Sequence, residues 1–294
     1  MKRSKRHLLL SVLAMACGLV GITLEAQAET MSLQQLRQAT HIHGIGVDPG
    51  DPAKVLLATH HGFFTVTPDG QATRRSTDRN DYMGFTPHPT DPDLLYASGH
   101  PVGGGNMGVI VSRDGGNQWS QLAKGVNGPV DFHQMDISKA DPTTLYGVHG
   151  GLQVSHDGGK SWAVKGPLPE GLYDLTASSQ QVERLYAGTK TGLRVSDDAG
   201  GSWRNPSLYR AATPMVQSAG EGEVYAFMVG VGLLKNKESN SSWQVISRDW
   251  GQRYLLHLAA DPSDPKRLYG VTGQGDILTS QDGGHNWKAF GSQP

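Results

Sequence analysis

The octet SRDGGNQW, residues 112–119, determines the fold class that we expect for this chain of 294 residues. Its pattern S-x-D-x-G-x-x-W has three further full copies and two degenerate ones: Ser155–Trp162, Ser196–Trp203, Ser280–Trp287, Asn236–Trp243 and Thr67–Arg74. The tryptophans follow one another about every 40 residues in a single register. A repeat of this length predicts that one supersecondary unit is used several times.

A short apolar run precedes each octet and predicts a strand. The runs are Val55–Ala58, Leu95–Ala97, Leu145–Gly147, Leu185–Ala187, Val224–Ala226 and Leu268–Gly270. An Asp-Pro pair, typical of a turn, precedes four of them. Each unit therefore reads as four antiparallel strands joined by short turns, which is the blade of a β-propeller.

Six such units fit the chain, at roughly 41–77, 81–123, 131–166, 171–206, 214–247 and 255–291. We therefore predict an all-β fold: a single six-bladed β-propeller of four-stranded antiparallel blades, spanning residues 41–294. A seven-bladed ring is the alternative, because residues 29–40 could contribute an extra strand.

The octets resemble the Asp-box (BNR) repeats of the sialidase and sortilin-like superfamily. The resemblance implies a propeller in which these turns lie at the periphery, away from the binding site. Asp114, Asp157, Asp198 and Asp282 are accordingly expected to be structural, with a calcium site at the turns as the alternative.

The N-terminus predicts export. A basic start (Lys2, Arg3, Lys5 and Arg6) precedes an apolar stretch and the small-residue site Ala26-Gln27-Ala28, as in a secretory signal peptide. We expect residues 1–28 to be removed, residues 29–40 to form a lead segment, and the protein to be periplasmic or extracellular. Lipidation at Cys17, the chain's single cysteine, or a retained membrane anchor is the alternative.

Histidines gather at one face of the predicted ring. In antiparallel blades the start of the innermost strand and the second loop share one end. The repeat register makes His43, Met83 and His133 equivalent, and likewise His41, Asp81 and Asp131. The resulting candidate metal ligands are His41, His43, His60, His61, Asp81, Met83, His100, Asp131, His133, Met135 and His149.

This set of side chains favours a transition metal. Histidine with methionine suits copper, and histidine with aspartate suits zinc. We expect an exported, non-catalytic protein that binds such a metal or another small polar ligand. A net charge of -1 argues against a nucleic-acid or anionic-membrane partner.

Two other functions stay open at this point. The sialidase resemblance suggests a glycoside hydrolase that would use Asp81 and Asp131, although no arginine stands at the predicted starts of the first four blades to clamp a substrate carboxylate. The glycine-rich residues 99–109 could instead contact a protein partner of a periplasmic scaffold or assembly factor, or act as a lid.

Overall fold

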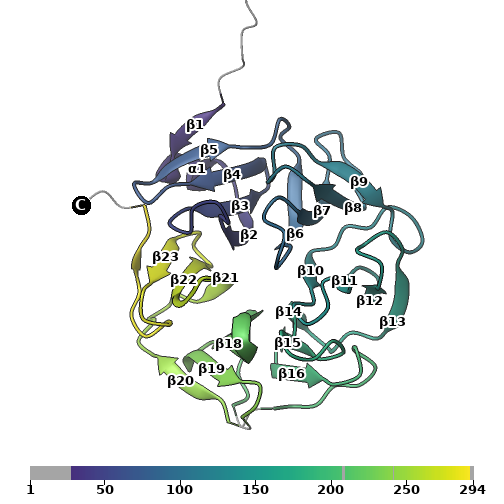
Figure 1. The fold of residues 1–294 in the computed structure, drawn as a ribbon. Helices are drawn as coiled ribbons and strands as arrows, with labels where there is room; N and C mark the ends of the chain where they lie inside the picture. Colours follow the sequence, from purple (N-terminus) through teal and green to yellow (C-terminus); the bar gives the residue numbers. More distant parts are fainter. Residues whose placement is uncertain (1–27, 207–208, 241, 292–294) are drawn as a thin grey trace, which may run out of the picture.

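The computed structural model describes residues 28–206, 209–240 and 242–291. Six antiparallel sheets surround one axis, which confirms the six-bladed β-propeller (Figure 1). The predicted signal peptide falls almost entirely on residues 1–27, outside the described part. Within the described part, no helix has the length and apolar character needed to cross a membrane.

Each blade is a consecutive run of strands, with the first strand nearest the axis. Blade 1 holds β2 (Ile42–Val47), β3 (Val55–Thr59), β4 (Gly62–Val66) and β5 (Gln71–Arg74). Blade 2 holds β6 (Asp81–Pro87), β7 (Leu95–His100), β8 (Val109–Ser112) and β9 (Ser120–Ala123). Blade 3 holds β10 (Gln134–Ile137), β11 (Leu145–Val148), β12 (Leu152–Ser155) and β13 (Ala163–Gly166).

The second half of the ring repeats this order. Blade 4 holds β14 (Leu172–Ala177), β15 (Leu185–Thr189) and β16 (Gly192–Ser196). Blade 5 holds β17 (Met215–Ser218), β18 (Glu223–Met228), β19 (Gly232–Lys237) and β20 (Gln244–Ser247), with a 3₁₀ turn η1 at Gly220–Gly222. Blade 6 holds β21 (Leu255–Asp261), β22 (Asp264–Thr272), β23 (Ile277–Ser280) and β24 (Lys288–Ala289).

Two blades depart from four strands. The lead segment forms β1 (Thr30–Ser32), which pairs with β5 and gives blade 1 a fifth, outermost strand rather than starting a seventh blade. In blade 4 the fourth strand shrinks to a single bridge between Val195 and Arg204.

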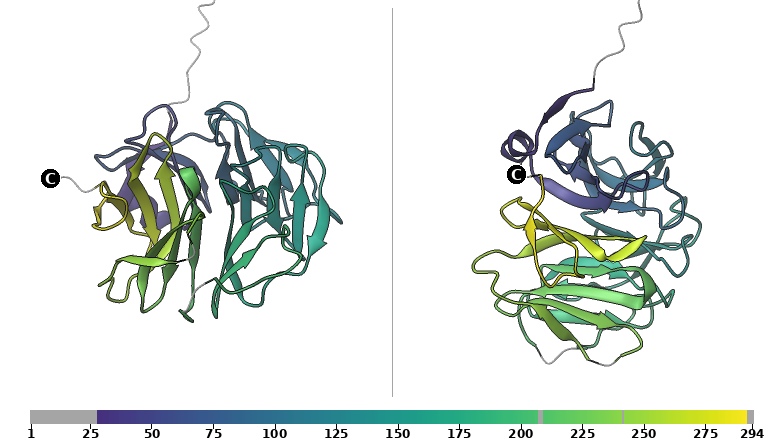
Figure 2. Two further views of the ribbon diagram at one scale, coloured as in Figure 1. Left: turned by 60° about the horizontal axis from the view of Figure 1, so that its bottom comes forward. Right: turned by 60° about the vertical axis from the view of Figure 1, so that its left-hand side comes forward.

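The ring closes between blades 1 and 6 by packing rather than by an exchanged strand. The short helix α1 (Leu33–Ala39), whose start is capped by Ser32 and Gln35, buries Leu33 and Leu36 against residues of blade 6 that include Tyr269 and Phe290. The Tyr269 hydroxyl also donates to the Pro52 carbonyl at 2.8 Å. Figure 2 shows α1 at the rim beside the last strands of the chain.

The repeated octets form turns that use their own polar groups. In the first full copy, Ser112 Oγ donates to Asp114 Oδ1 at 2.8 Å, and that oxygen accepts the Gln118 N–H at 2.9 Å. The indole of Trp119 packs 5.4 Å from the Phe63 ring of blade 1. The hydroxyl and N–H of Ser161 likewise lower the pKa of Asp157 to about 2, so this carboxylate serves the turn.

Candidate metal centre

The strand register places equivalent residues of blades 1 to 3 where the repeat predicts them. Gly46 pairs with Leu56, Thr86 with Tyr96 and Asp136 with Tyr146, so the three innermost strands are aligned. Counting back along each strand makes His43, Met83 and His133 equivalent. A bulge between Ile42 and Gly44 leaves His43 without a cross-strand partner.

The first triad consists of His43, His60 and Asp81. His43 Nε2 lies 3.4 Å from Asp81 Oδ1, and His60 Nδ1 lies 2.8 Å from Asp81 Oδ2. Blade 1 supplies both imidazoles, from the start of β2 and from the β3–β4 loop, and blade 2 supplies the carboxylate. One donor atom from each residue lies within 4.8 Å of the other two.

The second triad consists of His100, Asp131 and His133 and repeats this arrangement one blade further. His133 Nε2 lies 2.6 Å and His100 Nε2 lies 3.1 Å from Asp131 Oδ2. His100 Nδ1 donates to the Gly105 carbonyl at 2.8 Å. That hydrogen bond places the proton of the neutral imidazole on Nδ1, so Nε2 carries the lone pair when His100 is neutral, as an outer-shell carbonyl does for metal-bound histidine.

The two triads are neighbours. Asp81 of the first triad and His100 of the second are cross-strand partners on β6 and β7. Directly opposed residues of an antiparallel pair have Cβ atoms roughly 5 Å apart. The mouth of the ring therefore carries two similar ligand sets side by side on blades 1 to 3.

Each triad contains buried polar atoms that lack a hydrogen bond. Among the described residues, His43 Nε2, Asp81 Oδ1 and Asp131 Oδ1 are buried and have no hydrogen-bond partner. Asp81 and Asp131 are only 9% and 7% exposed. An unsatisfied buried carboxylate oxygen is costly, so these atoms are suited to a ligand that the protein itself does not provide.

Within the triads, the pKa values of two histidines are shifted in opposite directions. Burial lowers the pKa of His43, against the opposing effect of Asp81 and with a contribution from the nearby imidazoles. The hydrogen bond to Gly105 raises the pKa of His100, and Asp131 acts in the same direction. The lowered pKa of His43 favours the neutral imidazole, which is the form that coordinates metals.

The other predicted ligands lie outside the triads. His61 is exposed and its ring stacks edge-on 4.9 Å from His60. His41 is exposed, and its carbonyl accepts the His60 N–H. His149 Nδ1 lies 3.1 Å from the Asp131 carbonyl oxygen rather than its carboxylate. Met83 is buried, and Met135 belongs to a hydrophobic cluster of blades 2 and 3.

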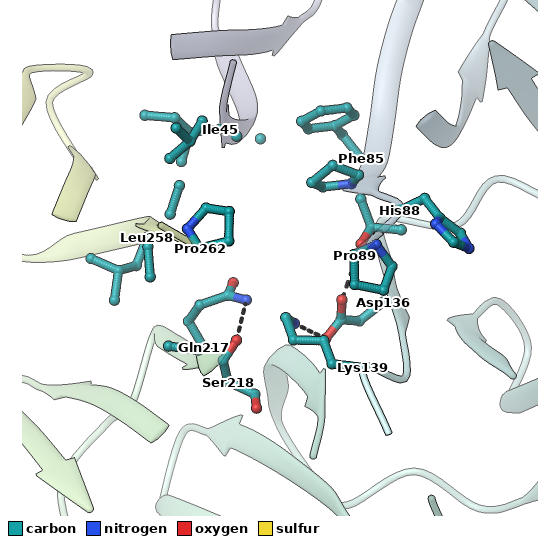
Figure 3. Close-up of a pocket in the computed structure, with 18 of the residues that line it drawn as sticks. Ile45, Phe85, His88, Pro89, Asp136, Lys139, Gln217, Ser218, Leu258 and Pro262 are labelled. Atoms are coloured by element: carbon teal, nitrogen blue, oxygen red, sulfur yellow. Dashed lines mark hydrogen bonds and ion pairs between the residues drawn. The ribbon is translucent and has the colours of Figure 1, made fainter. Parts of the chain in front are cut away.

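A channel runs along the axis beneath the triads and encloses a cavity of about 560 Å³ (Figure 3). Asp136, which the sequence analysis did not single out, lies on its wall. Its carboxylate accepts from Thr86 Oγ1 at 3.1 Å and Thr176 Oγ1 at 2.6 Å, which ties blades 2, 3 and 4 together. The alignment of the repeats could have identified Asp136, because Thr86, Asp136 and Thr176 occupy equivalent positions on the innermost strands of three neighbouring blades.

Comparison with known proteins supports the fold. No protein-family model matches the chain, so its likeness to Asp-box proteins stays a resemblance. An oligoxyloglucan-reducing end-specific xyloglucanase of Emericella nidulans is 23% identical over 282 residues, which cover 83% of this chain and 33% of that enzyme.

Comparison with solved structures also supports the propeller fold. The GH74 xyloglucanase of Xanthomonas campestris superposes with a TM-score of 0.55 at 18% identity, over 89% of this chain and 46% of that one. The extracellular domain of a two-component system protein of B. thetaiotaomicron gives 0.57 at 13% identity, over 85% and 33%. The chain thus spans less than half the length of each of these three proteins.

Proposed function

We propose that this protein binds divalent transition-metal ions at the mouth of its propeller, one at each triad. The observation that carries the proposal is that two histidines and one aspartate converge in each triad, while His43 Nε2, Asp81 Oδ1 and Asp131 Oδ1 are buried and make no hydrogen bond. Two imidazoles and one carboxylate form a ligand set that leaves coordination positions open for water or a substrate.

The donor types favour zinc or another borderline divalent ion over copper(I). Copper(I) prefers thiolate and thioether ligands, whereas imidazole and carboxylate suit zinc, copper(II), iron(II) or nickel. The triads contain nitrogen and oxygen donors, and Met135 packs in a hydrophobic cluster instead. The copper that the His and Met pairing suggested is therefore proposed only as copper(II).

The test is metal stoichiometry in matched pairs of variants. Wild type should bind two Zn²⁺ or Co²⁺ ions per chain, measured by elemental analysis and calorimetric titration. His60→Ala and His100→Ala should each weaken one site at least about tenfold, because each removes a coordinating nitrogen.

Adjacent histidines supply the controls. His61→Ala and His149→Ala should retain both ions, because neither imidazole belongs to a triad. Equal metal uptake by His60→Ala and His61→Ala would contradict the site assignment.

Glycoside hydrolysis is the second candidate, favoured by the match to the xyloglucanase of Emericella nidulans over most of this chain. Asp81 and Asp131 would then be the paired carboxyl groups that such a reaction needs. Release of reducing sugar from xyloglucan oligosaccharides by wild type, abolished in both Asp81→Asn and Asp131→Asn, would establish it. Hydrolysis that survives both substitutions would refute it.

Export and a protein partner are further proposals. The basic and apolar N-terminal pattern supports a periplasmic or extracellular location. The loop residue Val102, two positions after His100 in the sequence, is 77% exposed and offers one apolar contact for a partner. An assembly or scaffold role would rest on such contacts.

A further inference from the structure

We infer that the channel beneath the triads binds a small organic molecule that presents an oxyanion group, such as a carboxylate, to the metal ions. This inference rests on the proposed metal binding and names the kind of ligand that would complete it. The cavity of about 560 Å³ is within the range of small-molecule sites.

Every blade contributes an accessible residue to the channel wall. One half-buried side chain comes from each innermost strand: His43, Phe85, Gln134, Asp174, Gln217 and His257. Phe85 offers a ring face, and the two glutamines offer amide hydrogen bonds. This wall suits a neutral body with some polar groups, held by one aromatic contact and by hydrogen bonds.

The two ends of the cavity differ. His43 and His133, members of the two triads, line the end at the mouth. Turns between the first and second strands of the blades line the other end, where Pro49, Pro89 and Pro262 lie. A ligand that enters between these turns would meet the metal ions at the opposite end of the channel, at the mouth.

The charges favour an anionic group at the metal end. A single carboxylate per triad neutralises half the charge of a divalent ion, so each occupied site keeps a positive charge. Among the carboxylates that line the channel, Asp136 and Asp174 already have protein donors, for Asp174 the N–H groups of Leu175 and Val216 at 2.9 and 2.8 Å. Asp48 and Asp261 form ion pairs with Arg75 and Arg267, so these four are not left to attract a cationic ligand. Asp91 and Glu221 also line the cavity, but they belong to the turns at the end away from the triads.

Two hydroxamates test this arrangement, because both chelate the metal but differ in size. Benzohydroxamate and acetohydroxamate are titrated into Co²⁺-loaded protein, and the visible spectrum of Co²⁺ reports binding. Gln217→Trp fills the channel from β17, whereas Gln244→Trp places the same bulk on the exposed outer strand β20 of the same blade.

The expected result is selective. Gln217→Trp should weaken benzohydroxamate at least about tenfold and acetohydroxamate less than about twofold, because only the larger probe needs the filled volume. Gln244→Trp and wild type should behave alike, and all three should bind Co²⁺ equally. Ala260→Phe, on the channel side of β21, provides a second filled channel if Gln217→Trp does not fold.

Two contrary results would distinguish failure of the channel site from failure of metal binding. Equal benzohydroxamate affinity in wild type and the filled channels would overturn the channel as the binding site while leaving metal binding intact. Failure of wild type to bind Co²⁺ would overturn both this inference and the proposed function, and the metal titration alone reveals it.

Discussion

At the scale of single residues, position on the strand matters more than residue type. His60 and His61 are adjacent, yet the imidazole of His60 lies 2.8 Å from Asp81, whereas the ring of His61 contacts the ring of His60 and belongs to neither triad. The same holds for His100 and His149, which occupy equivalent loops of neighbouring blades but contact the carboxylate and the backbone of Asp131, respectively.

Asp174 provides a pH-dependent prediction at this scale. Burial raises its pKa to about 7 from 3.8. The folded protein therefore holds this proton more tightly than the unfolded chain, and the resulting stability is lost as pH rises from about 4 to about 7. Burial lowers the pKa of His257 to about 4, so its contribution to stability rises over the same pH range. The contribution of Asp174 must therefore be isolated as the difference between wild type and a variant that is changed only at this residue.

That difference is the free energy of unfolding of wild type minus that of Asp174→Asn. Urea denaturation at several pH values should show it falling between about pH 4 and pH 7 and level above pH 8, because the amide does not titrate. A difference that is constant across this range would show that Asp174 does not take up the proton.

At the scale of the element, the turn of the repeated octet depends on glycine. Gly116 has φ of +96°, and a Cβ there would lie 2.4 Å from the Phe63 ring of the neighbouring blade. Gly116→Ala should therefore destabilise the protein by roughly 1–3 kcal/mol through strain and overpacking. Gly103→Ala is the control, because open space surrounds that position.

Thermal denaturation distinguishes these two variants. A loss of this size should lower the melting temperature of Gly116→Ala by several degrees, and Gly103→Ala should stay within about a degree of wild type. Similar melting temperatures for both would mean that the turn can relax away from Phe63.

These turns also show why the fold could be predicted and part of the site could not. Ser112, Asp114 and Trp119 act within one short segment, so their pattern is visible in the sequence. The link between Thr86 and Asp136 crosses two blades, and so does the approach of His257 to His43. Such contacts depend on the spacing and tilt of the blades, which no local pattern records. Alignment of the repeats placed the six triad residues among eleven candidates, but it did not divide them into two groups.

At the scale of the whole molecule, the ring must be held at one seam. Blade 1 and blade 6 are each built from consecutive strands, and among the described residues no strand links the beginning of the ring to its end. The seam is closed by side chains: the leucines of α1 in the cluster with Tyr269, the Tyr269 bond to Pro52, and an ion pair between Arg37 and Asp276.

Leu36 is the strongest test of this seam, because it is 1% exposed and packs in the cluster that joins the two blades. Leu36→Ala should lower the free energy of unfolding by roughly 2–5 kcal/mol, since it leaves a cavity. Gln38→Ala, on the exposed side of the same helix, should change it by less than about 0.5 kcal/mol. Urea denaturation measures both. If the two variants unfold alike, the strands alone hold the ring closed; if Leu36→Ala also separates the transition into two steps, the seam is the point at which the ring opens.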